Sequence, residues 1–212
     1  MPSDNFPYTE DMKFSTNYNI LFFLFTHDPK VWVMDVASNN VIDTFTDSQD
    51  CINYPTSIAP SRQNDDIVYI GDFHNKNIVK VDMTTNDCEQ VKDLDFCHEG
   101  YTHIDISQDA QYMIVCCATS RKNINCTEYS DPSTDYTTQT WSVTISPYFG
   151  YQIQPRGLVY APNGSKAYMM VHEQMTDGYS VLIELEIDSN RSSVSYSKLT
   201  HDTETSDPEK IT

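Results

Sequence analysis

The chain has 212 residues, of which 39% are hydrophobic and 12% aromatic, so it carries enough apolar side chains to form one folded core and is not a disordered tail. Its 31 acidic and 13 basic residues give a formal net charge of −18, a sign that repels phosphate backbones and anionic lipid headgroups. The composition therefore argues against nucleic-acid binding. Its polar residues, rich in Asp, Thr, Ser, Tyr and Asn, favour strands and turns over helices.

The first strong pattern in the chain is the apolar run Ile20 to Phe25. It is far shorter than the roughly 20 residues that a membrane-spanning helix needs, so we expect a buried strand and no membrane span. The residues before it include Asp4, Glu10 and Asp11 against a single Lys13, whereas a secretory signal begins with basic residues. If the protein is secreted, we expect its signal to lie upstream or to have been removed.

Strand patterns then recur in four approximate copies, about 45 to 55 residues apart. Each copy holds three clear strand patterns and a weaker fourth. The copies span residues 12–50, 51–96, 97–146 and 147–200, and an acidic tail follows at 201–212. Four short antiparallel strands per repeat form the unit of a β-propeller blade, which buries its faces only by stacking on neighbours. The sequence thus predicts an all-β fold, a β-propeller of about four blades. A β-sandwich or irregular barrel is the alternative.

Two segments carry a resemblance to a known family. The segment from Arg156 to Tyr168 resembles the blade-opening pattern of the β-propeller superfamily with YVTN and NHL repeats, and Val81 to Asn86 matches the strand-Asp-x-x-x-Asn ending of those blades. Six to eight blades are common in that family. The resemblance therefore implies either a small closed ring or part of a larger propeller, and an open arc would leave two apolar blade faces exposed.

Alternating apolar positions within the strands predict the core. The predicted core residues are Ile20, Phe22, Val31, Val33, Ile67, Tyr69, Val79, Val81, Ile114, Trp141, Leu158, Tyr168, Leu182 and Leu185.

The six cysteines are candidates for disulfides, namely Cys51, Cys88, Cys97, Cys116, Cys117 and Cys126. Adjacent cysteines in a strand point to opposite faces, so Cys116 and Cys117 should find different partners. We expect Cys126 to pair with one of them and a second bridge to form among the first three cysteines. Six reduced, buried thiols are the alternative, and the lack of a Cys-x-x-Cys spacing disfavours zinc.

Three sequons place candidate glycosylation sites at Asn125, Asn163 and Asn190, all in predicted turns or loops. Together with the even number of cysteines, they favour an extracellular or secretory-pathway protein, with a cytoplasmic one as the alternative.

A polar insertion from Ala118 to Gln139 interrupts the third copy. A loop longer than about 15 residues in a compact domain is usually functional or disordered. We therefore predict that it contacts a partner through Arg121, Tyr129 and Tyr136, because arginine and tyrosine are enriched in protein interfaces. A mobile surface loop is the alternative.

The chain shows no sequence motif of a catalytic site, and we expect no cofactor. Calcium is possible at Asp65-Asp66, at Asp93 and Asp95 or at Asp131 and Asp135, although none of these matches a spaced calcium loop. The favoured function is a non-catalytic module that binds a protein partner or a second copy of itself. The alternative is a metal-dependent propeller hydrolase or lactonase of the gluconolactonase type, with ligands in the central channel, where the inner strands offer Phe14, Ile58, Ile104 and Leu158.

Overall fold

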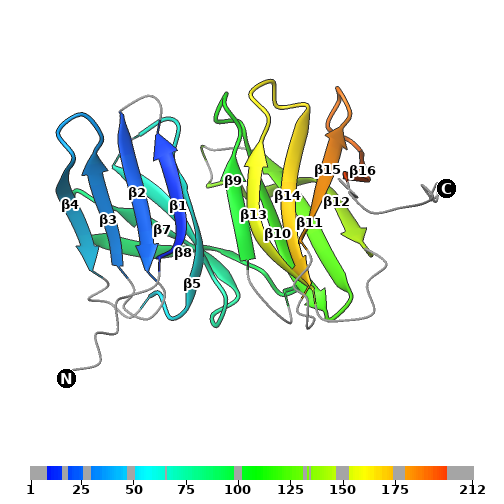
Figure 1. Ribbon diagram of the computed structural model, residues 1–212, viewed down its shortest axis with the longest axis horizontal. Coiled ribbons are helices and arrows are strands. Elements are labelled where there is room, and N and C mark those ends of the chain that lie inside the picture. Colours follow the sequence, from blue (N-terminus) through cyan, green and yellow to red (C-terminus); the bar gives the residue numbers. More distant parts are fainter. Residues whose placement is uncertain are drawn as a thin grey trace.

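The computed structural model contains four antiparallel sheets of four strands each (Figure 1). It describes residues 9–15, 19–25, 30–46, 51–64, 66–97, 102–130, 133, 135–146, 153–173 and 180–199, and these residues form no α-helix. The predicted tail at 201–212 lies outside the described residues.

Each sheet is formed by four strands that follow one another in sequence. The first sheet contains β1 (Thr9–Ser15), β2 (Ile20–Phe25), β3 (Lys30–Asp35) and β4 (Asn40–Thr46). The second contains β5 (Pro55–Pro60), β6 (Ile67–Asp72), β7 (Asn77–Asp82) and β8 (Asp87–Asp93). The third contains β9 (Thr102–Ile106), β10 (Tyr112–Ser120), β11 (Asn123–Ser130) and β12 (Thr138–Ile145). The fourth contains β13 (Ile153–Tyr160), β14 (Lys166–Glu173), β15 (Ser180–Ile187) and β16 (Val194–Leu199).

Aspartate and asparagine side chains shape the hairpins, which explains how a chain with only 6 Gly makes so many turns. Asp35 accepts a hydrogen bond from the Ser38 backbone N–H at 2.7 Å, which lowers the pKa of its carboxyl group. Four residues after Asp35, Asn39 takes the left-handed backbone conformation with φ 58°. Asp82 and Asn86 repeat this arrangement in the second sheet. Asparagine tolerates this conformation better than most residues, so it takes the place of glycine here.

The first strand of every sheet lies at the centre of the molecule. β1 contacts β5, β5 contacts β9 and β9 contacts β13, so the four sheets follow one another around a common axis. This arrangement is a four-bladed β-propeller, and the predicted all-β propeller fold is confirmed.

Each sheet presents two faces, and the hydrophobic core fills the spaces between consecutive sheets. We call the face that packs on the following sheet the forward face and the opposite one the rear face. Phe22, Val31 and Val33 on the forward face of the first sheet pack against Ile58 and Val79 on the rear face of the second. Similar clusters join the second sheet to the third and the third to the fourth.

The joint between the fourth and first sheets differs from the other three. Among the described residues, no hydrophobic cluster joins these two sheets. Instead, all large hydrophobic side chains of the described residues that are 39% to 57% exposed belong to them or to the turn between β3 and β4. They are Met12, Phe14, Trp32, Val36, Val41, Ile42, Val159, Met170, Leu182, Tyr196 and Leu199.

Eleven of the fourteen predicted core residues are buried, and two of the three exceptions follow from this open joint. Leu182 is exposed and Tyr168 is only half-buried, because both lie on the forward face of the fourth sheet. Ile67 is half-buried at the edge of the cluster between the second and third sheets. The prediction that these three residues are buried is therefore wrong.

The substitution Phe22→Ala should lower the free energy of unfolding by about 3–5 kcal/mol, because it removes a fully buried ring between the first and second sheets. Phe14→Ala, at a ring that is 45% exposed on the opposite face of the same sheet, should cost much less. Urea denaturation followed by circular dichroism measures both variants. Equal losses would contradict the assignment of the two faces.

Candidate functional site

Polar contacts hold the inner end of the open joint together. The Lys13 Nζ donates to the Leu158 carbonyl at 2.7 Å and lies 3.5 Å from the Asp105 carboxylate. Arg156 and Glu10 form an ion pair at 3.6 Å. The first and fourth sheets thus meet at the axis through charged side chains, while their outer parts share no apolar contact cluster in the described part of the chain.

Side chains on the inner strands also fasten two of the other joints. Asp11 Oδ2 accepts a hydrogen bond from the Ile58 N–H at 3.0 Å, and Asp105 Oδ2 accepts one from the Tyr160 N–H at 2.7 Å. Burial raises the pKa of the Asp11 carboxyl group. Each of these carboxylates belongs to one sheet and binds the backbone of the next sheet. Together with Glu10, Lys13 and Arg156 they form the axial cluster, which positions the blades.

His103 lies in the same axial cluster and is fully enclosed. Burial, together with the nearby Lys13 and Arg156, lowers the pKa of its imidazole to about 3, so the ring is neutral. It donates a hydrogen bond to the Pro155 carbonyl, while its Nε2 has no partner among the described residues. Unpartnered polar atoms are rare in protein interiors, so this ring is the most unusual group at the axis.

A second buried charge lies between the third and fourth sheets. The carboxylate of Glu128 is paired with Arg191 and accepts hydrogen bonds from Tyr160 Oη at 2.7 Å and Thr140 Oγ1 at 2.8 Å. The Arg191 guanidinium also stacks on the Tyr112 ring at 3.6 Å. Both carboxylate oxygens have hydrogen-bond partners, so this group helps to fix the joint between the third and fourth sheets.

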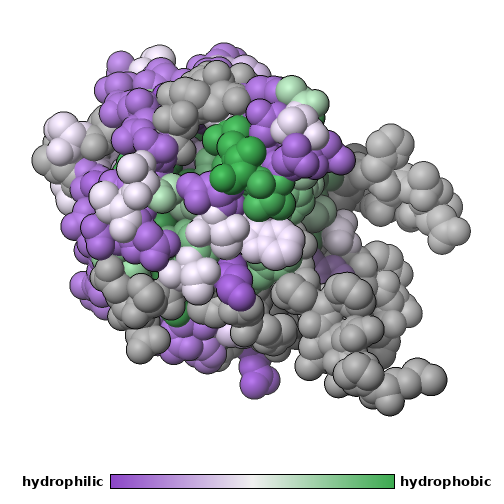
Figure 2. Space-filling model, turned by 90° about the vertical axis from the view of Figure 1, so that its left-hand side faces the viewer, coloured by the Kyte–Doolittle hydropathy of each residue, from purple (hydrophilic) through white to green (hydrophobic). Residues whose placement is uncertain are grey.

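The rear face of the first sheet carries apolar side chains on three neighbouring strands, with Lys30 at the start of β3 on the same face. Met12 lies opposite Phe23 and Phe14 opposite Leu21 across β1 and β2, and Phe23 in turn lies opposite Trp32 on β3. In the other three sheets, the corresponding face is covered by the preceding blade. Figure 2 shows hydrophobic atoms at the surface among hydrophilic ones at the end of the molecule where β3 and β4 lie.

The forward face of the fourth sheet is partly apolar. Met170 on β14 lies opposite Leu182 on β15, and Leu182 lies opposite Leu199 on β16. Lys166 and Glu184 form an ion pair at 3.0 Å on the same face. The two open faces are therefore the surfaces at which this propeller offers apolar side chains to another molecule.

The predicted partner-binding loop has a different structure from the one expected. Most of Ala118 to Gln139 belongs to β10, β11 and β12, and Arg121 lies in the short turn between β10 and β11. Tyr129 and Tyr136 are only 3% and 2% exposed. The prediction of a long contact loop is therefore wrong, because most of the polar residues of this segment belong to strands.

Both tyrosines instead fill the joint between the second and third sheets. Tyr136 Oη donates to the Ala110 carbonyl at 3.0 Å, and the Tyr136 ring packs edge-on against Tyr69. Tyr69 Oη donates to Asp135, which also pairs with Lys80 at 3.1 Å. Burial raises the pKa of Tyr69 and of Tyr136, so the phenol groups of Tyr69 and Tyr136 stay neutral and have a structural role.

The sequons differ in their surroundings. Asn163 and Asn190 are exposed and lie in turns. Asn125 lies within β11, half-buried, and its Oδ1 accepts a hydrogen bond from Ser142 Oγ at 3.2 Å. The expected loop location is thus wrong for Asn125, whereas glycosylation at Asn163 and Asn190 stays a prediction.

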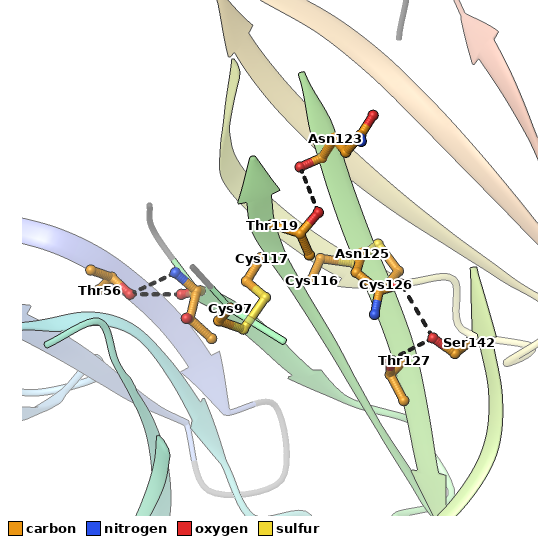
Figure 3. Close-up of a disulfide and its surroundings, with 11 residues drawn as sticks. Thr56, Cys97, Cys116, Cys117, Thr119, Asn123, Asn125, Cys126, Thr127 and Ser142 are labelled. Atoms are coloured by element: carbon orange, nitrogen blue, oxygen red, sulfur yellow. Dashed lines mark hydrogen bonds between the residues drawn. A yellow bond between two sulfur atoms is a disulfide. The ribbon is translucent and has the colours of Figure 1, made fainter. Parts of the chain in front are cut away.

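All six cysteines are paired, so the expectation of disulfide bonds is supported. The bridges are Cys51–Cys88, Cys97–Cys117 and Cys116–Cys126. Figure 3 shows Cys117 directed toward Cys97 and Cys116 toward Cys126, as expected for neighbours in one strand. The first bridge ties the segment before β5 to β8, and the second ties the segment after β8 to β10. Three disulfides suggest an oxidising environment.

The described residues contain no group of three or more His, Cys, Asp or Glu side chains that could hold a metal ion. Of the calcium candidates, Asp65 and Asp131 lie outside the described residues, and Asp135 is engaged by Tyr69 and Lys80. Within the described ranges there is also no helix with the length and apolar character needed to cross a bilayer.

No protein-family model matches the chain, and no curated protein sequence is significantly similar to it. Similarity to solved structures is at the level of the fold. A chain of the nidogen/laminin complex is 10% identical with a TM-score of 0.59, over 89% of this chain and 78% of that one. The Cps50 (Swd1) β-propeller domain of Myceliophteria thermophila is 9% identical with a TM-score of 0.52, over 92% and 72%. Hydrazine synthase of Kuenenia stuttgartiensis is 12% identical with a TM-score of 0.56, over 92% and 67%. The β-propeller is thus shared, and membership of the YVTN or NHL repeat type stays a prediction.

The pKa of His103 predicts a specific pH dependence of stability. Below pH 6.5 the unfolded chain takes up a proton at this imidazole, but the folded chain does not until about pH 3. The free energy of unfolding should therefore fall as the pH drops through this window, by up to about 1.4 kcal/mol per pH unit from this group. In His103→Gln this contribution should vanish, while His74→Gln, at an exposed histidine, serves as the control. Denaturation curves at several pH values test this, and parallel wild-type and His103→Gln curves would refute it.

The Cys51→Ala/Cys88→Ala variant should lose about 4 kcal/mol of unfolding free energy in the chain-entropy model, because its bridge closes a loop with a sequence separation of 37. The Cys116→Ala/Cys126→Ala variant, with a separation of 10, should lose about 3 kcal/mol from this effect. Guanidinium denaturation without reductant measures both, with the reduced wild type as reference. A Cys51→Ala/Cys88→Ala variant as stable as the wild type would show that this bridge does not constrain the chain.

Proposed function

We propose that this chain is a non-catalytic β-propeller module that binds other protein in an extracellular or secretory-pathway assembly. The observation that carries the proposal is the pair of open apolar faces, on the first and fourth sheets, at the joint that lacks a hydrophobic cluster in the described part of the chain. Contiguous exposed apolar surface on a folded protein marks an interaction site.

The form of these faces favours protein over a small molecule. A small ligand is enclosed by a concave pocket, whereas the open faces are pleated sheet surfaces that extend over three strands each. Trp32, Met12 and Met170 are residue types enriched at the centres of protein interfaces. Their strands belong to hydrogen-bonded sheets whose opposite faces pack in the hydrophobic core, so a partner meets a preformed surface.

The hydrolase alternative requires metal ligands from several inner strands. The described residues offer no such group, and of the inner-strand positions Ile58, Ile104 and Leu158 belong to the hydrophobic clusters. The most unusual axial group is the neutral, enclosed His103, which would need to lose its surroundings to meet a substrate. No observation therefore favours this alternative over the binding module.

The proposed setting rests on the cysteines and sequons. Three disulfides are typical of proteins that fold in an oxidising compartment, and two of the three sequons are exposed in turns. The similar fold in the nidogen/laminin complex shows a propeller chain within an assembly of proteins, which is the kind of role proposed for this chain.

Hydroxyl-radical footprinting tests the proposal, because methionine and tryptophan side chains react readily when exposed. Met12, Trp32 and Met170 should be oxidised several-fold more slowly in the assembly isolated from the native source than in the purified chain. Tyr196, an exposed residue on the other face of the fourth sheet, is the internal control. Identical rates in both samples, with the native chain migrating as a free monomer, would overturn the proposed function.

A further inference from the structure

We propose that two copies of this chain associate face to face, with the rear face of the first sheet in each copy packed on the forward face of the fourth sheet in the other. The inference rests on the proposed function and names the partner as a second copy.

The chain itself shows which surfaces fit together. At each of its three apolar joints, the forward face of one sheet packs on the rear face of the next. The faces left over are one rear face, on the first sheet, and one forward face, on the fourth. They are thus the two halves of a joint that the same chain builds three times, and a second copy offers both halves at once.

Within one copy these two faces do not pack on each other as the others do. The bonds from Lys13 to Leu158 and from Arg156 to Glu10 join the inner strands β1 and β13, and the apolar side chains farther out remain exposed. Figure 1 shows the first and fourth sheets together on the near side of the molecule, with the second and third behind them. Both open faces therefore belong to one side of the molecule.

A two-fold axis parallel to the inner strands satisfies both faces without opening the axial contacts. Such an axis places the first sheet of each copy opposite the fourth sheet of the other, so the pair contains two identical joints and closes on itself. Further copies have no open face left to bind, so the assembly stops at two.

The available area matches a stable dimer. Strands about 4.8 Å apart that rise about 3.4 Å per residue give roughly 350 Å² for a face of three strands of seven residues. Two such faces supply roughly 700 Å² per copy, close to the roughly 800 Å² that one partner usually contributes to a specific interface.

The net charge of the chain predicts how self-association depends on salt. On the rear face of the first sheet, the paired residues Met12, Phe14, Leu21, Phe23 and Trp32 are uncharged, and on the forward face of the fourth sheet Lys166 and Glu184 form an ion pair, so the contact is largely apolar. Each copy nevertheless carries a net charge of −18, and two copies repel each other at long range. Added salt screens this repulsion, so self-association should tighten as salt rises, whereas binding to a basic partner would weaken.

Sedimentation velocity from about 1 to 100 µM, at low and moderate salt, tests the inference. The wild type should sediment as a dimer whose dissociation constant falls several-fold as salt is raised. Trp32→Glu, on the rear face of the first sheet, and Leu182→Glu, on the forward face of the fourth, should each be monomeric. Tyr196→Glu, at a similarly exposed residue outside both faces, should remain a dimer. Circular dichroism confirms folding, and Trp32→Thr and Leu182→Thr replace any variant that fails to fold.

Mixing the two variants distinguishes this pairing from other dimers. Trp32→Glu and Leu182→Glu chains, each monomeric alone, should form a mixed dimer, because one of its two joints contains only wild-type faces. A mixture that stays monomeric, or a Leu182→Glu variant that dimerises as well as the wild type, overturns the pairing. A wild type that is monomeric at 100 µM overturns self-association altogether. If footprinting then still shows both faces protected in the native assembly, a different protein covers them and the proposed function stands.

Discussion

The whole structure depends on one geometric fact, which is that a β-strand directs successive side chains to opposite faces of its sheet. In this chain both faces of the second and third sheets are apolar, so neither sheet can fold alone and each must lie between two others. Sheets that stack through both faces lead naturally to a propeller. For the same reason the first and fourth sheets each have one face that no neighbouring sheet of the described chain covers.

Two kinds of contact hold the blades together. Apolar clusters fill three of the joints, while at the axis charged and polar side chains bind the backbone of the neighbouring strand, as Asp11 binds Ile58 and Asp105 binds Tyr160. A carboxylate that accepts a backbone N–H fixes a position more precisely than an apolar contact does. The disulfides then add covalent links to the second and third sheets, where the chain passes from one blade to the next.

The repeat structure could be predicted from sequence because it is local: period-two alternation marks strands such as Ile20–Phe25, and the Asp-x-x-x-Asn spacing marks the turn at Asp82. The contact surface could not be predicted from the sequence. Leu182 and Leu185 look equivalent in a strand pattern, and only the arrangement of the sheets shows that one is exposed and the other buried. The prediction that the segment containing Tyr129 is a loop is wrong for a related reason. The polar residues of β11 face a buried hydrogen-bond network, so they alternate with apolar residues less clearly than in a surface strand. The pairing of Cys97 with Cys117 likewise depends on how two sheets meet.

The position of Cys116 and Cys117 has a mechanical consequence. Because these neighbours are bridged to Cys126 and Cys97, β10 is anchored through both of its faces. If a force pulls the two ends of the chain apart, the disulfide bonds would therefore carry it from residue 97 to residue 126 and from residue 51 to residue 88. The backbone within these two segments would not be straightened. The first and fourth sheets would unravel under load, whereas much of the second and third would remain as closed loops. The chain would then behave as an extensible tether with a fixed limit to its length.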